Sequence, residues 1–336
     1  MRDHRIVWAV VVLGVVASLA FGAPRRSFDR AVLPEGGDVW HMAGGSRSIV
    51  IEGVWVNGQG PYRFLLDTGT TGGVRIDARV ATALGLDAAG QTKTGARRPG
   101  SGPTLDTIEL DSLEVGGVRW EGVSGAVRTL SHEQTPAEHR IDGVLAWHLF
   151  VDWTLTLDLG AREVRVRDEA LPRPGREGVV FMRGDRDGPT APLVVGRVKV
   201  NALIDTGNGG GVLINSRFRA RAPIEGELVE AGFVSTVDGT SPVLAAALSE
   251  PMTLAGVELG QGRGLFTDGI YPANVGLGVL AGGVVEIDAA NSRIRLTLGA
   301  NAQEAGGEEP AESGLDAAGG IDDDDEDAPA DDREPG

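Results

Sequence analysis

The sequence has 336 residues, with 51 glycines, few aromatic residues, no cysteine and a formal net charge of −17 at neutral pH. The lack of cysteine excludes disulfides, thiol nucleophiles and cysteine-ligated zinc or iron–sulfur sites. Residues 301–336 contain fourteen Asp or Glu against the single Arg333, so the rest of the chain carries only −4, and we expect no nucleic-acid partner.

The first segment along the chain predicts export. Residues 6–20 form an apolar run that follows Arg2 and Arg5 and ends in small side chains, as a secretory signal peptide does. Counting on to residue 23 brings the run close to the length that spans a bilayer, so an uncleaved anchor is the alternative. We assign residues 1–23 to a signal peptide or N-terminal anchor. The expected location is periplasmic or secreted, or membrane-anchored through residues 6–23.

After the export segment, apolar alternation predicts a series of short strands, and the glycine-rich composition fits the tight turns between them. Turn pairs such as Asn57-Gly58 and Asp238-Gly239 separate the strands. One helix is expected in the first half of the chain, at residues 77–86. The expected strands cover residues 48–56, 63–66, 107–113, 155–159, 164–166, 193–200 and 284–287.

An internal repeat runs through this strand-rich region. Phe-Leu-Leu-Asp-Thr-Gly at residues 64–69 reappears as Ala-Leu-Ile-Asp-Thr-Gly at residues 202–207. Gly-Val-Leu-Ala at residues 143–146 reappears at residues 278–281. A third match is an Asp seven residues before an Arg. It occurs as Asp158 with Arg165 and as Asp288 with Arg295.

Three matched segments in the same order predict a duplicated architecture. We expect an N-terminal lobe at residues 34–170 and a C-terminal lobe at residues 171–300, related by a pseudo-two-fold axis. Residues 301–336 are rich in Gly, Ala, Asp and Glu and cannot build a hydrophobic core. A disordered acidic tail is therefore predicted.

The two Asp-Thr-Gly triplets carry the predicted chemistry. Each follows an apolar strand, so Asp67 and Asp205 leave buried elements, where a lone carboxylate is costly. Two carboxylates at short range share one proton and titrate as a coupled pair. The ionised member can take a proton from water while the protonated member donates to a peptide carbonyl. We therefore predict that Asp67 and Asp205 are catalytic.

The residues after each Asp are expected to support the site. The two glycines allow a sharp turn behind each carboxylate. The two threonines can hydrogen-bond across the pseudo-axis. The Gly143 and Gly278 segments are each expected to carry a strand close beside an active-site loop. The expected supporting residues are Thr68, Gly69, Thr70, Thr206, Gly207 and Asn208.

These motifs resemble those of the pepsin and retropepsin superfamily of aspartic proteases, in particular bacterial single-chain, two-lobed, retropepsin-like proteins. The resemblance covers roughly residues 34–300. It implies an all-β, bilobal acid-protease fold of two similar β-barrel lobes, with the substrate cleft between them. It also implies a hairpin flap, for which residues 95–102 and 237–240 are candidates. Asn208 departs from the pepsins, which place Ser or Thr after the glycine, and the flap lacks their tyrosine.

The predicted function is that of an aspartic endopeptidase acting on a peptide or protein substrate as a monomer, with no metal and no cofactor. Two alternatives keep the same fold: a catalytically inactive peptide-binding protein, and a membrane-tethered envelope protein whose lobes serve assembly. The histidines show no metal-ligand spacing and are expected to be surface or packing residues. They are His4, His41, His132, His139 and His148.

Overall fold

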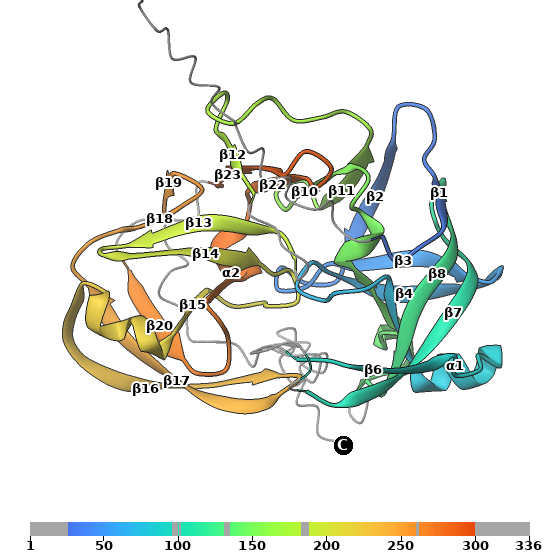
Figure 1. The fold of residues 1–336 in the computed structure, drawn as a ribbon, viewed down its shortest axis with the longest axis horizontal. Helices are drawn as coiled ribbons and strands as arrows, with labels where there is room; N and C mark the ends of the chain where they lie inside the picture. Colours follow the sequence, from blue (N-terminus) through green and yellow to red (C-terminus); the bar gives the residue numbers. More distant parts are fainter. Residues whose placement is uncertain are drawn as a thin grey trace, which may run out of the picture.

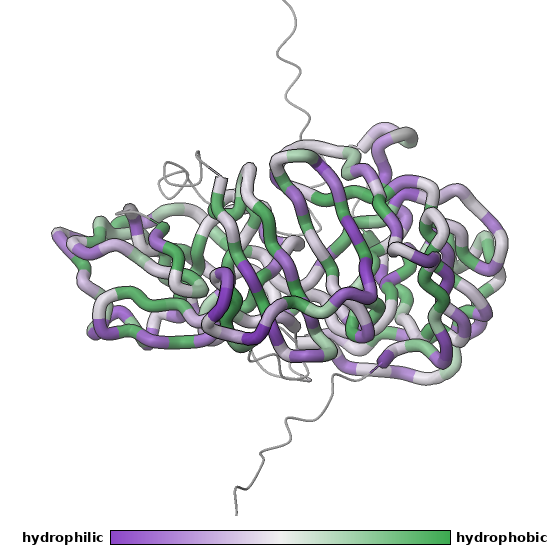
Figure 2. Tube along the Cα trace, turned by 90° about the horizontal axis from the view of Figure 1, so that it is seen from above, coloured by the Kyte–Doolittle hydropathy of each residue, from purple (hydrophilic) through white to green (hydrophobic). Residues whose placement is uncertain are grey.

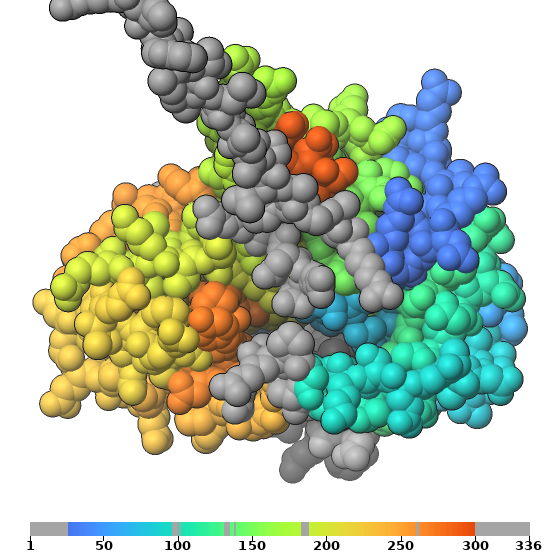
Figure 3. Space-filling view, in the orientation of Figure 1, coloured from blue at the N-terminus to red at the C-terminus, as the bar shows by residue number. Residues whose placement is uncertain are grey.

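The computed structural model describes residues 26–95, 100, 102–130, 135–182, 188–259 and 262–299. The predicted export segment and acidic tail lie outside these ranges. Within them, no helix is both long enough and apolar enough to cross a bilayer. The fold is all-β and two-lobed, as predicted, and the lobes lie side by side (Figure 1, Figure 3).

The N-terminal lobe contains a closed six-stranded barrel. Its strands are hydrogen-bonded in the order β3-β4-β9-β5-β8-β7, and pairing between β3 and β7 closes the ring. Strand β6 (Gly90–Lys93) extends the sheet from β7, and β1 (Arg30–Val32) pairs with β8. The barrel strands are β3 (Val50–Val56), β4 (Gln59–Asp67), β5 (Val74–Asp77), β7 (Thr104–Val115), β8 (Val118–Arg128) and β9 (Gly143–Ala146).

The C-terminal lobe is built on a nine-stranded sheet with the order β16-β17-β20-β15-β21-β14-β13-β18-β19. The parallel pairs β14–β21 and β15–β20 repeat the parallel pairs β4–β9 and β5–β8 of the first lobe. Figure 1 shows β13 and β14 above the long hairpin of β16 and β17. The strands are β13 (Thr190–Val195), β14 (Val198–Ile204), β15 (Val212–Asn215), β16 (Ile224–Thr236), β17 (Gly239–Leu248), β18 (Met252–Leu254), β19 (Val257–Glu258), β20 (Arg263–Thr267) and β21 (Ala273–Val275).

A six-stranded sheet joins the lobes and contains the pseudo-two-fold axis. Hairpin β10–β11 and hairpin β22–β23 lie next to each other, and β10 pairs with β22 so that Thr156 faces Glu286. These hairpins carry the Asp158–Arg165 and Asp288–Arg295 repeats, which therefore are structurally equivalent. The sheet consists of β12 (Val179–Phe181), β23 (Arg293–Thr297), β22 (Val284–Asp288), β10 (Thr154–Asp158), β11 (Glu163–Arg167) and β2 (Asp38–Ala43).

Helices are short within the described residues. The expected helix at 77–86 is α1 (Ala78–Leu84), capped by the Asp77 side chain, which accepts from the Arg79 N–H at 2.9 Å. It ends at Gly85, whose φ of 64° is the left-handed conformation that glycine adopts easily. The others are α2 (Leu277–Leu280) and the 3₁₀ turns η1 (Ala137–His139), η2 (Trp147–Leu149) and η3 (Ser216–Arg221).

One hydrophobic core runs through both lobes and the joining sheet. Figure 2 shows hydrophobic and hydrophilic stretches alternating along the chain trace. In this core Trp40, Trp120 and Phe150 pack together with ring centroids 6.1 to 6.3 Å apart, and Trp120 meets the other two rings edge-on.

The structure corrects one of the repeat matches. Residues 143–146 form β9, and β9 pairs with β4 so that Ala146 lies opposite Asp67. In the second lobe the strand with this pairing is β21, at residues 273–275, whereas residues 278–281 follow it in helix α2 and its C-cap. The two Gly-Val-Leu-Ala segments are therefore not equivalent. The match was wrong because it relied on four identical residues. Structural equivalence depends instead on which strands pair and in which register, and the sequence does not show this.

Candidate active site

Asp67 and Asp205 stand at equivalent places in the two lobes. Asp67 is the last residue of β4, and Asp205 directly follows β14. Each of these strands pairs in parallel with a short buried strand, β9 or β21, and the backbone N–H of Asp205 donates to Val275 O at 3.0 Å. Both carboxylates therefore leave rigid, buried elements.

Four hydrogen bonds join the two Asp-Thr-Gly loops across the pseudo-axis. The Thr68 hydroxyl donates to Ile204 O at 2.6 Å and accepts from the Thr206 N–H at 3.1 Å. Reciprocally, the Thr206 hydroxyl donates to Leu66 O at 2.7 Å and accepts from the Thr68 N–H at 3.0 Å. These are the cross-lobe bonds that the sequence predicted for Thr68 and Thr206. They fix the position of one carboxylate relative to the other.

The two glycines of the triplets face the opposite lobe. A Cβ built on Gly69 would lie 2.4 Å from Asp205 Oδ1, and a Cβ on Gly207 would lie 2.7 Å from Asp67 Cγ. Neither glycine has the left-handed φ that a sharp turn would require. The reason for glycine here is therefore the close approach of the opposing carboxylate, not the backbone turn that we expected. Burial raises the pKa of Asp205, and the two carboxyl groups are close enough that the charge of Asp67 raises this pKa further.

Asp67 is held by donors from its own loop. Its Oδ1 accepts from the N–H groups of Gly69 at 2.8 Å and Thr70 at 3.1 Å. Its Oδ2 accepts from the Thr70 hydroxyl at 2.6 Å. The Asp67 side chain is buried. Three donors and no acceptor from this loop suit an ionised carboxylate.

Asp205 has a different set of partners. Its Oδ1 accepts from the Gly207 N–H at 2.9 Å, and its Oδ2 accepts from the amide of Asn274 at 2.5 Å. Burial, and then the charge of Asp67, raise the pKa of Asp205 to about 7. Asp205 is therefore the member of the pair that keeps a proton in mildly acidic solution.

Asn208 hydrogen-bonds to its neighbours and not to the Asp205 carboxylate. Its amide Nδ2 donates to Asn274 Oδ1 at 2.8 Å, and its Oδ1 accepts from the Gly210 N–H at 2.8 Å. This bond orients the Asn274 amide so that its NH₂ group points at Asp205. Asn208 acts on Asp205 through Asn274.

Sequence reasoning missed Asn274. In β21, Asn274 pairs with Leu203, two residues before Asp205. In β9, Val144 pairs with Leu65, two residues before Asp67. Asn274 and Val144 are therefore equivalent positions. The signal that could have found it was a polar residue inside the apolar segment Ala-Asn-Val. That signal has meaning only when the correct repeat register is known.

Glycines also shape the second loop. A Cβ on Gly276 would lie 2.5 Å from the carbonyl oxygens of Asn208 and Gly210, and one on Gly278 would lie 2.9 Å from Gly210 O. The close approach expected for Gly278 is therefore present, although it comes from a helix and not from a strand.

The two flap candidates belong to hairpins of opposite lobes. Strands β6 and β7 flank the first flap candidate, but residues 96–99 and 101 lie outside the described residues. Strands β16 and β17 join at residues 237–238, within the second candidate. A Cβ on Gly102 would lie 3.0 Å from Asp238 Oδ1, so the described part of one hairpin touches the tip of the other.

His148 lies beside the first active-site loop and is buried. Its Nδ1 accepts from the Gly72 N–H at 3.0 Å, so this ring nitrogen carries no proton. It is a packing residue, in line with the expectation. Across the described ranges, no cluster of three or more His, Cys, Asp or Glu side chains could hold a metal ion.

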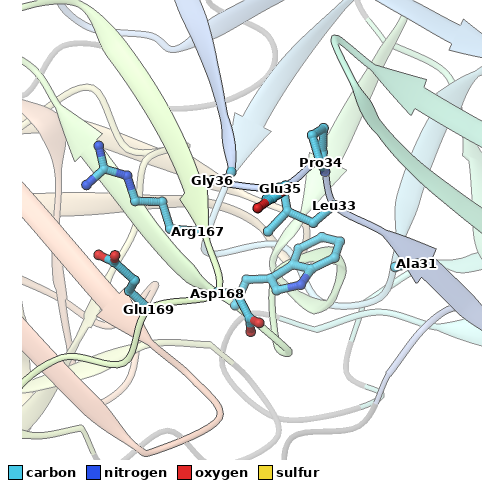
Figure 4. A pocket seen from close by; sticks show the side chains of 10 residues that line it. Ala31, Leu33, Pro34, Glu35, Gly36, Arg167, Asp168 and Glu169 are labelled. Atoms are coloured by element: carbon cyan, nitrogen blue, oxygen red, sulfur yellow. The ribbon is translucent and has the colours of Figure 1, made fainter.

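A cavity of about 570 Å³ lies elsewhere in the molecule, and neither Asp67 nor Asp205 lines it. Figure 4 shows Arg167 and Glu169 on one side, across from Leu33 and Pro34 on the other. Charged groups of both signs line this cavity together with a few apolar side chains, and they do not converge on one point (Figure 4).

Comparison with known proteins finds a family match for part of the first lobe. Residues 53–149, which include the first Asp-Thr-Gly triplet, match a family described as aspartyl protease. One similar solved structure is a retropepsin-like aspartic protease from Rickettsia conorii, at 15% identity and a TM-score of 0.27, covering 41% of this chain and 91% of that one. No curated protein matches the chain. Over residues 53–149, the family match supports the resemblance to aspartic proteases.

Proposed function

We propose that this chain, part of which matches the aspartyl protease family, is an endopeptidase in which Asp67 and Asp205 activate one water molecule. The observation that carries the proposal is the cross-lobe hydrogen bonding of Thr68 and Thr206, which holds the two carboxyl groups face to face. Because one chain supplies both halves of the pair, the monomer is complete.

The environments of the two carboxyl groups assign their roles. Asp67, with its three donors, is the general base and removes a proton from the water as the water oxygen attacks the peptide carbonyl carbon. Asp205, with its raised pKa, is the general acid and gives its proton to the carbonyl oxygen. The product of this step is a neutral tetrahedral diol.

The second step returns the pair to its starting state. The proton now on Asp67 passes to the peptide nitrogen, and the C–N bond breaks. Asp205 takes back a proton from one hydroxyl as the new carboxylic acid forms. Substrate atoms and protons balance, and no bond to the enzyme forms.

Peptide or protein is the proposed substrate class. Export remains a prediction, since residues 1–23 lie outside the described residues. The proposed location is the periplasm or the outside of the cell, where a soluble or anchored protease meets extracytoplasmic proteins.

A randomised peptide library tests the proposed activity. The purified full-length chain is incubated with the library at acidic and neutral pH, and new termini are identified by mass spectrometry. Asp67→Asn and Asp205→Asn should each abolish cleavage, while Asp87→Asn, at an exposed position, should not. Cleavage that survives either active-site substitution would refute the proposed mechanism. A chain that binds peptides without cutting them would be the inactive binding protein.

A further inference from the structure

The walls beside the two catalytic residues differ in charge. In the first lobe, β5 places Arg75 directly opposite Val144 of β9. In the second lobe, β15 places Leu213 directly opposite Asn274 of β21. Arg75 and Leu213 are therefore equivalent positions, and one is a cation where the other is apolar.

The face of the sheet that carries these side chains is the catalytic face. Residues on either side of Arg75, namely Val74 and Ile76, belong to the main core, so Arg75 lies on the opposite face. On the equivalent face of the second lobe, the Asn274 side chain reaches Asp205. Directly opposed residues of antiparallel strands share a face. Arg75 therefore lies on the side of β5 that adjoins the catalytic loop.

The guanidinium of Arg75 is close to that loop. A Cβ on Gly72 would lie 3.0 Å from Arg75 Nη1. Burial lowers the pKa of Arg75 to about 10, and the charge of Asp67 acts against this effect. The guanidinium is thus near enough to the catalytic pair to respond to its charge.

Arg75 is under-satisfied for a largely buried cation. Among the described residues its hydrogen bond is from Nη1 to Val74 O at 3.1 Å, and no carboxylate there forms a salt bridge with it. A guanidinium has five N–H donors and matches a carboxylate in a two-point geometry. Some of its surface remains exposed to solvent. A ligand carboxylate could therefore reach it and satisfy it.

A second arginine adds to the positive charge. Arg128 ends β8 in register with Asp77, and its charge also lowers the pKa of Arg75. The equivalent residue in the second lobe is Thr267, which ends β20 in register with Asn215. Both differences between the lobes make the first wall more basic.

We propose that Arg75, with Arg128 beside it, forms a substrate subsite for an acidic side chain next to the bond that is cut. The inference rests on the proposed peptidase function and names its substrate class: peptides with Glu or Asp at one fixed position relative to the cut. Charge-assisted bonds to a partly buried guanidinium are among the stronger polar contacts, so the preference should be pronounced.

The test uses the same randomised library, followed by a matched pair of peptides. Cleavage sites of the wild-type chain should be enriched in Glu and Asp at one position. A synthetic peptide with Glu there should be cut with a kcat/KM about tenfold or more above its Gln counterpart. Arg75→Leu, which installs the residue of the second lobe, should bring this ratio close to one. Arg75→Lys should retain part of it.

Controls separate this subsite from other roles of Arg75. Arg119→Leu removes an exposed arginine of β8 and should leave the Glu/Gln ratio unchanged. Suppose Arg75→Leu lowers cleavage of both peptides equally, or shifts only the pH profile. Arg75 would then act through Asp67, and the subsite would be refuted while the peptidase assignment stands. Absence of any wild-type cleavage would instead refute the peptidase assignment itself.

Discussion

The two halves of the candidate active site share a backbone frame but hold their carboxyl groups with different side chains. In the first lobe, Thr70 of the Asp-Thr-Gly loop donates directly to Asp67. In the second, the donor is Asn274 of a neighbouring strand, and Asn208 of the loop only orients it. The equivalent Oδ2 atoms of the two Asp residues thus accept from donors at different places in the two lobes.

The two lobes share the features that depend on contacts between them. The Thr68 and Thr206 bonds cross the interface in both directions, and each glycine makes room for the other lobe's carboxylate. The features that differ lie within each lobe. They are the side chain that donates to the Oδ2 atom of the Asp, and the charge at the equivalent positions of Arg75 and Leu213. The comparison predicts that substitutions at the shared cross-lobe contacts reduce activity or stability more than substitutions at the positions that differ.

The largest effect is expected at Gly69. Gly69→Ala places a methyl group where the Asp205 carboxylate lies, and the pair must move apart. Displacements of this size cost about 100-fold or more in kcat/KM. Gly45→Ala is the matched control, since nothing lies within 4 Å of its Cβ position. Equal activity of both variants would contradict the face-to-face arrangement.

The cross-lobe bonds should contribute equally from either side. Thr68→Val and Thr206→Val each remove one hydroxyl that makes two buried hydrogen bonds. Each should lower the free energy of unfolding by about 2 kcal/mol, measured by denaturant titration. The Ser variants, which keep the hydroxyl, should lose less. A large inequality between the two Val variants would show that the interface is not symmetric.

A smaller effect is expected where the lobes differ. Asn274→Val installs the first-lobe residue and removes the donor to Asp205, so kcat/KM should fall about tenfold. The donor lowers the pKa of Asp205, so its loss should move the alkaline limit of activity to higher pH. Adding Asn208→Thr recreates the first-lobe arrangement and should restore part of the activity. No rescue, with an unchanged pH profile, would mean that Asn274 only supports the fold.

The smallest expected effect is on the pH dependence of stability. A carboxyl group with a raised pKa binds its proton more tightly in the folded state. The contribution of Asp205 to stability therefore falls as pH rises from its ordinary pKa of 3.8 to its folded-state pKa of about 7. Partial exposure screens this loss to on the order of 1 kcal/mol. Thermal unfolding of Asp205→Asn should show a flatter profile in that window. An identical profile would show that Asp205 does not titrate there.

The sequence predicted the two-lobed arrangement of the Asp-Thr-Gly loops because the patterns that indicate it are local. An Asp-Thr-Gly after an apolar strand is a local pattern, and its recurrence implies a symmetric partner. The Asn57-Gly58 turn and the Asp77 cap of α1 are local too, and the structure has both. The all-β, two-lobed fold follows from such local signals summed along the chain.

The sequence did not predict the features that depend on register. The equivalence of β9 and β21 follows from strand pairing, and a short identical segment pointed five residues too far along the chain. The role of Asn274 and the position of Arg75 follow from the same pairing. The reason for Gly69 and Gly207 lies in the other lobe, which no local pattern contains.

A double-mutant comparison tests the central claim most directly. The kcat/KM for one cleaved peptide is measured for Asp67→Asn, Asp205→Asn and the double variant. If both carboxyl groups act on one water molecule, each single substitution should remove as much activity as the double substitution does. Independent, multiplying losses, or near wild-type cleavage by either single variant, would contradict the shared-water mechanism.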